Sequence, residues 1–329
     1  MSSVFWMLKG KKSPAFRLVQ NGFDVWLANA RGNDFSMKHV NMSASDPRFW
    51  DFSFHEMAVY DVPAAIDYIR KKTGQRYKIT YIGHSMGTTI SYIYSSIHAK
   101  HAKNNVNMLI SIAPVAFLGH IKTWISLGSP LYNLLQRETM NLGLHGTGQY
   151  PQIRNLLKEF CFTPPYMNIC QRLVQSVVGT STEQIEPEVM PLFYRRYPAS
   201  FSIKTLLHFM QEVTNGGRFQ WYDYGPRGNL IRYRSDVPPE YDIEKIQVPV
   251  YLIYGEQDLL SVENDVFKLF IKLKSPKYLR LFQGENNNVV FNHNDFLFSR
   301  HIDEFNKFLY KIVSNATSLS SENSIYSYI

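Results

Sequence analysis

The pentapeptide Gly83-His84-Ser85-Met86-Gly87 is the stretch that decides the fold of this chain. It has the form Gly-x-Ser-x-Gly, with a strand-like run before it (77–82) and a helix-compatible stretch after it (88–97). A strand-to-helix turn of this kind strains the central Ser and raises its hydroxyl above the sheet. We therefore predict that Ser85 is a nucleophile, with Gly83 and Gly87 required because side chains there would collide with the strand and the helix. The alternative is an ordinary Gly-rich turn.

The composition is that of a globular protein with a large core. Hydrophobic residues make up 45% and aromatic residues 15% of the 329 residues, enough for one α/β domain with an inserted subdomain. The net charge of +8 is spread over dispersed Lys and Arg side chains, which argues against nucleic-acid binding. No window predicts a transmembrane segment, and the apolar run at 4–8 is not a signal peptide because its lysines follow it.

Strand and helix patterns alternate along most of the chain. Strand-like runs lie at 24–28, 77–82, 107–113, 248–254 and 277–282, and helix patterns lie at 54–71 (interrupted by Pro63) and 303–313. This alternation predicts a mostly parallel sheet with helices on both faces.

Between 115 and 236 no parallel-strand pattern appears, and Pro and Gly separate short apolar segments, which predicts a mainly helical insertion. We therefore expect four regions: the first part of the core with the Ser85 turn (1–114), the helical insertion (115–236), the second part of the core (237–313) and a flexible tail (314–329).

A serine nucleophile needs a base, and the base needs an acid that orients it. In a parallel sheet of this kind the order along the chain is Ser, acid, His. Asp258 follows the 248–254 strand directly, with Glu256 as the local alternative. We prefer Asp258, because an acid later in the turn reaches further over the edge of the sheet.

Several histidines compete for the part of the base. His293 lies between the last strand and the last helix, which is the expected position, whereas His301 lies on or beside the terminal helix. His84 sits inside the pentapeptide, and we expect its side chain to point away from the Ser85 hydroxyl and to pack structurally. His55 is expected at the surface or at a helix start. The sequence therefore predicts His293 as the base.

The cysteines and two glycosylation sequons bear on the compartment. The only cysteines, Cys161 and Cys170, could form a bridge or remain two buried thiols, and spacing alone leaves both open. Asn41-Met42-Ser43 and Asn315-Ala316-Thr317 are N-glycosylation sequons, making Asn41 and Asn315 candidate acceptors.

With these residues in place, the chain resembles the acid lipase family of α/β hydrolases, which includes lysosomal acid lipase, gastric lipase and insect lipase-3-like enzymes. The matching stretches are NGFDVWLANARGN (21–33), FWDFSFHEMAVYDVPAAIDYI (49–69), GHSMGTT (83–89), YDIEKIQVP (241–249) and NHNDF (292–296). The first two are long and uncommon, so the resemblance is more specific than the pentapeptide alone.

The resemblance implies a serine-dependent lipid ester hydrolase of the α/β-hydrolase fold. Ser85, Asp258 and His293 fall on the family's nucleophile, acid and base, and the Met86 N–H on its oxyanion donor. The resemblance also implies a Cys161–Cys170 disulfide and a cap and lid formed by the insertion at 115–236. The substrate would be a neutral triacylglycerol or sterol ester at a lipid–water interface, hydrolysed with no metal or organic cofactor by a secreted or lysosomal protein.

The sequence departs from the family pattern in two ways. Met86 stands where Gln is usual, although its backbone N–H could still stabilise an oxyanion. The family's first strands and its His-Gly-Leu segment, which supplies a second oxyanion donor, are expected to be missing, as in an incomplete gene model. Loss of one such donor typically costs about 10²–10³ in rate. The alternative function is therefore a catalytically inactive, lipid-binding relative or fragment.

Overall fold

The computed structural model describes residues 3–74, 77–127, 129–163, 166–179, 186, 188–197, 199–284 and 289–325. The strands are β1 (Ile79–His84), β2 (Val106–Ile112), β3 (Val250–Tyr254) and β4 (Lys277–Leu281). The α-helices are α1 (Pro14–Gln20), α2 (Phe54–Glu56), α3 (Val62–Thr73), α4 (Met86–Ile97), α5 (Ala99–Asn105), α6 (Ser129–Asn141), α7 (Pro151–Phe162), α8 (Tyr166–Val178), α9 (Val189–Arg196), α10 (Ile203–Thr214), α11 (Gly225–Tyr233), α12 (Glu263–Lys272), α13 (Asp295–Phe298) and α14 (Ile302–Ile325). The short 3-10 or π-helical segments are η1 (Ser3–Trp6), η2 (Gly10–Lys12), η3 (Pro47–Trp50), η4 (Met57–Asp61), η5 (Trp124–Leu127), η6 (Thr147–Gln149) and η7 (Ile243–Lys245).

The four strands form one parallel sheet in the order β1-β2-β3-β4. Because every strand runs in the same direction, the chain must cross back over the sheet between strands, and helices make these crossings. The central strands β2 and β3 are almost wholly buried, as expected for strands covered on both faces. The predicted fold class is confirmed in this respect.

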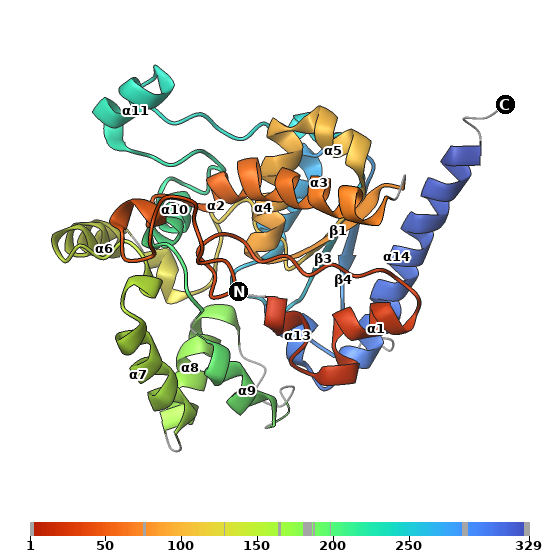
Figure 1. The fold of residues 1–329 in the computed structure, drawn as a ribbon, viewed down its shortest axis with the longest axis horizontal. Coiled ribbons are helices and arrows are strands. Elements are labelled where there is room, and N and C mark those ends of the chain that lie inside the picture. The colour runs from red at the N-terminus through yellow and green to blue at the C-terminus, as the bar shows by residue number, and fades with distance from the viewer. Residues whose placement is uncertain are drawn as a thin grey trace.

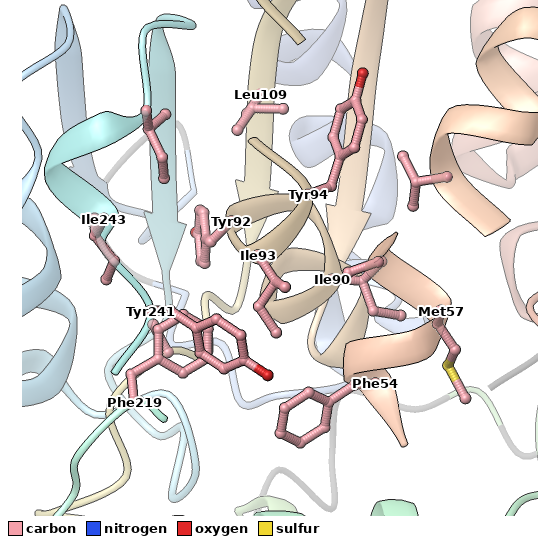
Figure 2. Packing of buried hydrophobic residues seen from close by; sticks show 14 of the residues in the cluster. Phe54, Met57, Ile90, Tyr92, Ile93, Tyr94, Leu109, Phe219, Tyr241 and Ile243 are labelled. Atoms are coloured by element: carbon pink, nitrogen blue, oxygen red, sulfur yellow. The ribbon is translucent and has the colours of Figure 1, made fainter. Parts of the chain in front are cut away.

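One face of the sheet is covered by α4, packed with η4, α3 and α12. Leu109 of β2 and Leu252 of β3 point to this face and belong to the same core as Ile90, Ile93 and Tyr94 of α4. Figure 2 shows the α4 side chains gathered against Leu109 from the sheet and Tyr241 and Ile243 from a later segment. The helix that follows Ser85 is therefore held by the main core.

The other face of the sheet is covered by α14 and α1. Ile110 and Ile112 of β2 alternate with Leu109 and pack with Phe305 and Leu309 of α14. In Figure 1, α14 stands to the right of the sheet, whereas α3, α4 and α5 lie on its other side. The sheet is thus a central layer with helices on both faces.

The chain between β2 and β3 is helical in the described residues, with α6 to α11 and no strand of the sheet. Figure 1 places α7, α8 and α9 together at the lower left, away from α14. The mainly helical character predicted for 115–236 agrees with these helices. None of the helices in the described part of the chain combines the length and apolar character that crossing a bilayer requires.

Two secondary-structure predictions differ from the structure. The predicted strand at 24–28 alternates between half-buried and exposed residues but forms no ladder. The reason is that a strand needs a partner, and among the described residues β1 pairs only with β2. The last helix, predicted to end at Val313, continues as α14 to Ile325.

The interruption predicted at Pro63 is present. Pro63 stands in the first turn of α3, and the π-helical η4 precedes it. Because proline has no N–H to donate to the residue four positions earlier, the helix widens locally before α3 begins.

The helical insertion buries a carboxyl group. Glu212 of α10 is fully buried, and in the described part of the chain neither of its carboxyl oxygens has a hydrogen-bond partner of good geometry. Burial raises the pKa of Glu212 well above its ordinary value, and the backbone of Gln220 offsets this only in part. The folded state therefore favours the neutral carboxylic acid.

We expect Glu212→Gln to stabilise the protein at neutral pH and to leave its stability unchanged in acid. Because the folded-state pKa is raised, the stability contributed by the neutral group is complete below the ordinary value of 4.5 and is lost as pH rises. Thermal unfolding should show a Tm higher by about 3 °C or more at about pH 7.5 and equal to wild type at about pH 4. The exposed Glu159→Gln is the control; an equal shift at both pH values would contradict the argument.

Candidate active site

Ser85 lies at the junction between β1 and α4. It is the N-cap residue of α4 and has φ 54° and ψ −123°, a conformation that side-chain-bearing residues rarely adopt. The Ser85 N–H donates to Ile112 O of β2 (3.1 Å), and the Thr88 N–H donates to Ser85 O (2.8 Å). Met86 begins α4, where a backbone N–H has no acceptor within the helix. An oxyanion beside Ser85 could therefore accept a hydrogen bond from Met86.

The two glycines of the turn are not equivalent. A Cβ on Gly83 would lie 2.8 Å from Gly87 C and 3.0 Å from Thr88 N, so a side chain there cannot be accommodated without moving α4. A Cβ on Gly87 would meet no atom within 4 Å beyond its own helix backbone. The expected collision is therefore found at Gly83 and is wrong for Gly87, which faces open space.

Asp258 follows β3 and is buried. One of its carboxylate oxygens, Oδ1, accepts hydrogen bonds from the backbone N–H groups of Leu260 (2.9 Å) and Ser261 (2.8 Å). The other, Oδ2, lies 2.8 Å from Nδ1 of His293. The backbone thus holds the carboxylate with one oxygen left for the imidazole.

His293 joins Asp258 to Ser85. Its Nδ1 faces Asp258, and its Nε2 lies 2.7 Å from Ser85 Oγ. Because Asp258 Oδ2 accepts a hydrogen bond from Nδ1–H, the neutral imidazole has an unprotonated Nε2 facing the serine hydroxyl. Residues from three distant parts of the chain therefore form one continuous hydrogen-bond chain.

The competing acid and bases lie elsewhere. Glu256 accepts a hydrogen bond from Gln283 (3.1 Å), and His301 is half-exposed and contacts Glu304 (3.3 Å). His55 stands in the first turn of α2, with its Nδ1 2.9 Å from the Tyr241 hydroxyl. None of these three is recorded in contact with Ser85 in the described part of the chain.

His84 does more than the packing that its position predicts. Its Nε2 lies 2.7 Å from the backbone oxygen of His293, so Nε2 carries the proton and donates. Burial lowers the pKa of His84 to about 3, with the nearby His293 ring adding to the effect. His84 is therefore a neutral donor that holds the backbone of His293. Nothing local in the sequence indicates this contact, because 209 positions separate the two residues.

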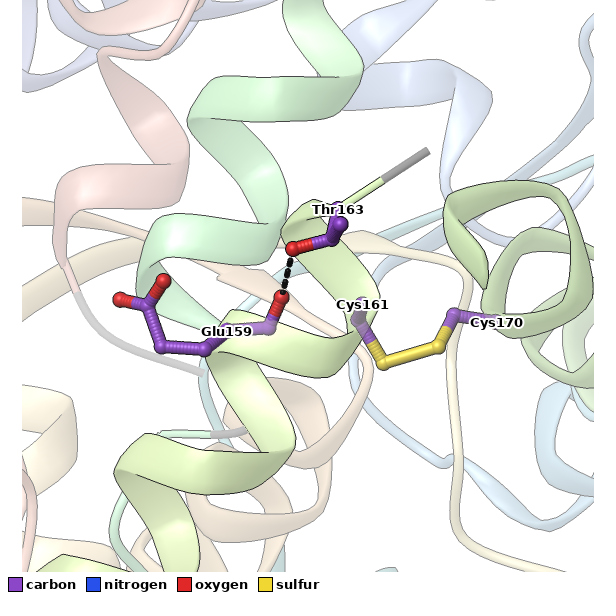
Figure 3. The surroundings of a disulfide bond; sticks show 4 residues. All are labelled: Glu159, Cys161, Thr163 and Cys170. Atoms are coloured by element: carbon purple, nitrogen blue, oxygen red, sulfur yellow. Dashed lines mark hydrogen bonds between the residues drawn. A yellow bond between two sulfur atoms is a disulfide. The ribbon is translucent and has the colours of Figure 1, made fainter. Parts of the chain in front are cut away.

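The two cysteines form a disulfide that joins the end of α7 to α8, with their Cα atoms 5.6 Å apart. Figure 3 shows the bridge beside the last turn of α7, where the Thr163 hydroxyl donates to Glu159 O (2.8 Å). The bridge implied by the family resemblance is thus present. Of the sequon residues, Asn41 lies in an exposed loop and Asn315 on an exposed position of α14.

An apolar recess lies beside the loop that carries His293. It is shallow and is bounded by α8, α9 and that loop. Its lining side chains are Gln171, Val174, Gln175, Val178, Val189, Met190, Phe193, Tyr194, Asn292, Asn294 and Phe298. Two of the lining residues, Asn292 and Asn294, flank His293 in the chain, so the recess adjoins the site.

Comparison with known proteins identifies the family. Residues 12–293 match the family model of the alpha/beta hydrolase fold. Among solved structures, Est816, an N-acyl homoserine lactone degrading enzyme, superimposes with a TM-score of 0.51 at 16% identity, covering 94% of this chain and 88% of its own. The chain therefore belongs to the α/β hydrolases.

Relatives of higher identity narrow the assignment. Human lipase member K is 32% identical over 289 residues, which cover 86% of this chain and 69% of the relative. Bovine gastric triacylglycerol lipase is 32% identical over 293 residues (88% and 70%). Lipase 3 of Drosophila melanogaster is 33% identical over 276 residues (82% and 68%). The chain is a member of the acid lipase family and a carboxylic ester hydrolase.

The two glycines of the turn make a matched test of its geometry. We expect Gly83→Ala to displace the start of α4 and to lower both the activity and the Tm, because overpacking against backbone typically costs about 1–3 kcal/mol. Gly87→Ala should fold with a Tm equal to or above that of wild type, since alanine favours helix over glycine by about 1 kcal/mol. Thermal unfolding and an ester assay decide; equal losses in both variants would contradict the geometry.

Proposed function

We propose that this protein hydrolyses neutral lipid esters through an acyl-enzyme formed on Ser85. The observation that carries the proposal is the hydrogen-bond chain from Ser85 Oγ through His293 to Asp258, with spacings of 2.7 and 2.8 Å. A base in contact with a serine hydroxyl and oriented by a buried carboxylate is the arrangement that activates an alcohol for attack.

The chemistry runs in two halves. Ser85 Oγ attacks the ester carbonyl while His293 Nε2 takes its proton, and the Met86 N–H stabilises the resulting oxyanion. Collapse of the intermediate breaks the ester bond, and the leaving alcohol takes the proton back from His293. Water then attacks the acyl-enzyme with His293 again as base, which releases the fatty acid and restores Ser85. Asp258 stabilises the imidazolium in both halves.

The proposal of a lipid substrate is supported by α7 and α8, because apolar side chains of both helices face solvent. On α7 these are Ile153, Leu156, Leu157 and Phe160, and on α8 they are Tyr166, Ile169 and Leu173. We call this set the α7–α8 surface. The polar Arg154 and Lys158 of α7 point the other way and pair with Asp34.

An exposed apolar surface of this kind marks a binding site rather than a core. We infer that the α7–α8 surface contacts the lipid–water interface and that residues 115–236 form a cap domain over the core regions 1–114 and 237–313. The names of the relatives, which include a triacylglycerol lipase, agree with a lipid ester as substrate.

The disulfide and the glycosylation sequons bear on the cellular compartment of the protein. Disulfides persist in oxidising compartments, so the Cys161–Cys170 bridge favours the secretory route. Asn41 and Asn315 are both exposed and could accept glycans there. We therefore infer a secreted or lysosomal enzyme, as its membership of the acid lipase family suggests.

The nucleophile can be tested directly with an organophosphonate probe. We expect the probe to label wild type and Ser45→Ala, whose serine is exposed and remote in sequence, and to leave Ser85→Ala unlabelled. Equal labelling of wild type and Ser85→Ala would reject the assignment.

The acid can be tested by kinetics. Asp258→Asn should retain the fold but lower kcat by about 10⁴, because the imidazole loses the acceptor that orients it.

The α7–α8 surface can be tested by comparing two physical forms of substrate. The double variant Leu156→Gln with Ile169→Gln should lower hydrolysis of an emulsified long-chain triacylglycerol about tenfold or more, since each side chain contributes about 1.5–3 kcal/mol when it leaves water. Hydrolysis of a dissolved short-chain ester should stay within about twofold. Ile231→Gln on α11, 77% exposed, is the control. Equal loss on both substrates would argue against interfacial contact.

A further inference from the structure

The end of α8 lies between the loop of the acid and the loop of the base. Gly179 follows α8 directly and is buried, with φ +111°, a conformation open to glycine. A Cβ there would lie 2.1 Å from Gln257 O and 3.0 Å from Asn292 Cβ. Gln257 immediately precedes Asp258, and Asn292 immediately precedes His293. Gly179 therefore closely approaches the chain neighbours of both Asp258 and His293.

Hydrogen bonds also connect the end of α8 to the loop that carries His293. The Asn292 side-chain Nδ2 donates to Gly179 O (3.0 Å), and the His293 backbone N–H donates to Val178 O (3.3 Å). The Asn292 Oδ1 meanwhile accepts from the N–H groups of Asn294 (2.8 Å) and Asp295 (3.1 Å). Asn292, only 1% exposed, thus holds the loop around His293 on one side and the end of α8 on the other.

The acid and base loops also meet without the insertion. The Gln257 N–H donates to Phe291 O (3.0 Å), and Gly255 packs against the same carbonyl, where a Cβ would lie 2.2 Å away. This contact fixes one end of the two loops. Gly179 lies between Gln257, which precedes Asp258, and Asn292, which precedes His293. It therefore sets the distance between the two loops at these residues.

We propose that Gly179 and Asn292 are positioning residues for the Asp258–His293 pair, which places the end of α8 in the catalytic geometry. The proposal rests on the roles of Ser85, Asp258 and His293 given above. Its physical basis is that a catalytic hydrogen-bond chain tolerates little displacement, and a shift of about 1 Å can cost about 10² in rate. A second consequence is that α8 cannot move away as a rigid body without breaking the hydrogen bonds at Val178 and Gly179. Opening the insertion at α8 would therefore cost both of these hydrogen bonds.

Gly179→Ala tests the separation of the two loops. The added Cβ cannot fit beside Gln257 O, so we expect kcat on a dissolved ester to fall about 100-fold with KM within about twofold. The rate of organophosphonate labelling at Ser85 should fall in parallel. Gly216→Ala is the matched control, because Gly216 has φ +79° in the same insertion and no atom within 4 Å of an added Cβ. It should lose similar Tm through backbone strain and keep kcat near wild type.

Asn292→Ser serves if Gly179→Ala does not fold. Serine retains an acceptor for the start of α13 but is too short to donate to Gly179 O, so kcat should fall about tenfold with little change in Tm or KM. A wild-type kcat in either folded variant, or a loss carried by KM, would overturn the positioning role. The proposed function fails separately, if Ser85→Ala is still labelled or if wild type hydrolyses no ester; the positioning role then falls with it.

Discussion

The backbone of Ser85 is the constraint on which the site depends. A non-glycine residue at φ 54° and ψ −123° stores about 1–3 kcal/mol of strain, which persists only where the surroundings over-determine it. Those surroundings are the hydrogen bond from Ser85 N–H to Ile112 O, the close approach of Gly83 to Thr88, and the packing of α4 in the main core. The sheet and α4 therefore hold the Ser85 backbone in this strained conformation.

The buried side chains of His84 and Glu212 make the stability of the folded state depend on pH in opposite senses. Burial lowers the pKa of His84 to about 3, so the stability that depends on its neutral form is lost as pH falls below the ordinary value of 6.5. Glu212 has the opposite shift, and its contribution is lost as pH rises above 4.5. The hydrogen bond that His84 donates to His293 O is open to both protonation states, so it offsets the effect of burial on the pKa only in part. Mildly acidic conditions therefore suit both groups best.

Local patterns predict the elements of the site, and non-local contacts decide its geometry. The strands β1 to β4 could be predicted within about two residues because each is a short apolar run bounded by turn residues. The proximity of Asp258 and His293 to Ser85 could be predicted because parallel strands place their carboxyl ends along one edge. The sequence could not show that 24–28 has no partner strand, or that Gly87 faces open space, because both depend on what packs nearby.

The same distinction explains why the contacts of Gly179 and the exposure of the α7–α8 surface could not be predicted from the sequence. The stripe of Ile153, Leu156, Leu157 and Phe160 has the spacing of an ordinary core-facing helix. The exposure of these side chains and the ion pairs of Arg154 and Lys158 with Asp34 show instead that the polar side faces inward.

The disulfide then joins α7 to α8, and the end of α8 touches the loops of Asp258 and His293. The exposed stripe on α7 is thus connected to the Asp258–His293 pair through the disulfide and the end of α8. Because the α8 anchor is formed by backbone groups and a buried amide, the surface can vary in its apolar side chains without altering the catalytic geometry. In the proposed function, the insertion separates recognition of the lipid–water interface from alignment of Ser85, Asp258 and His293, and it carries both on one pair of linked helices.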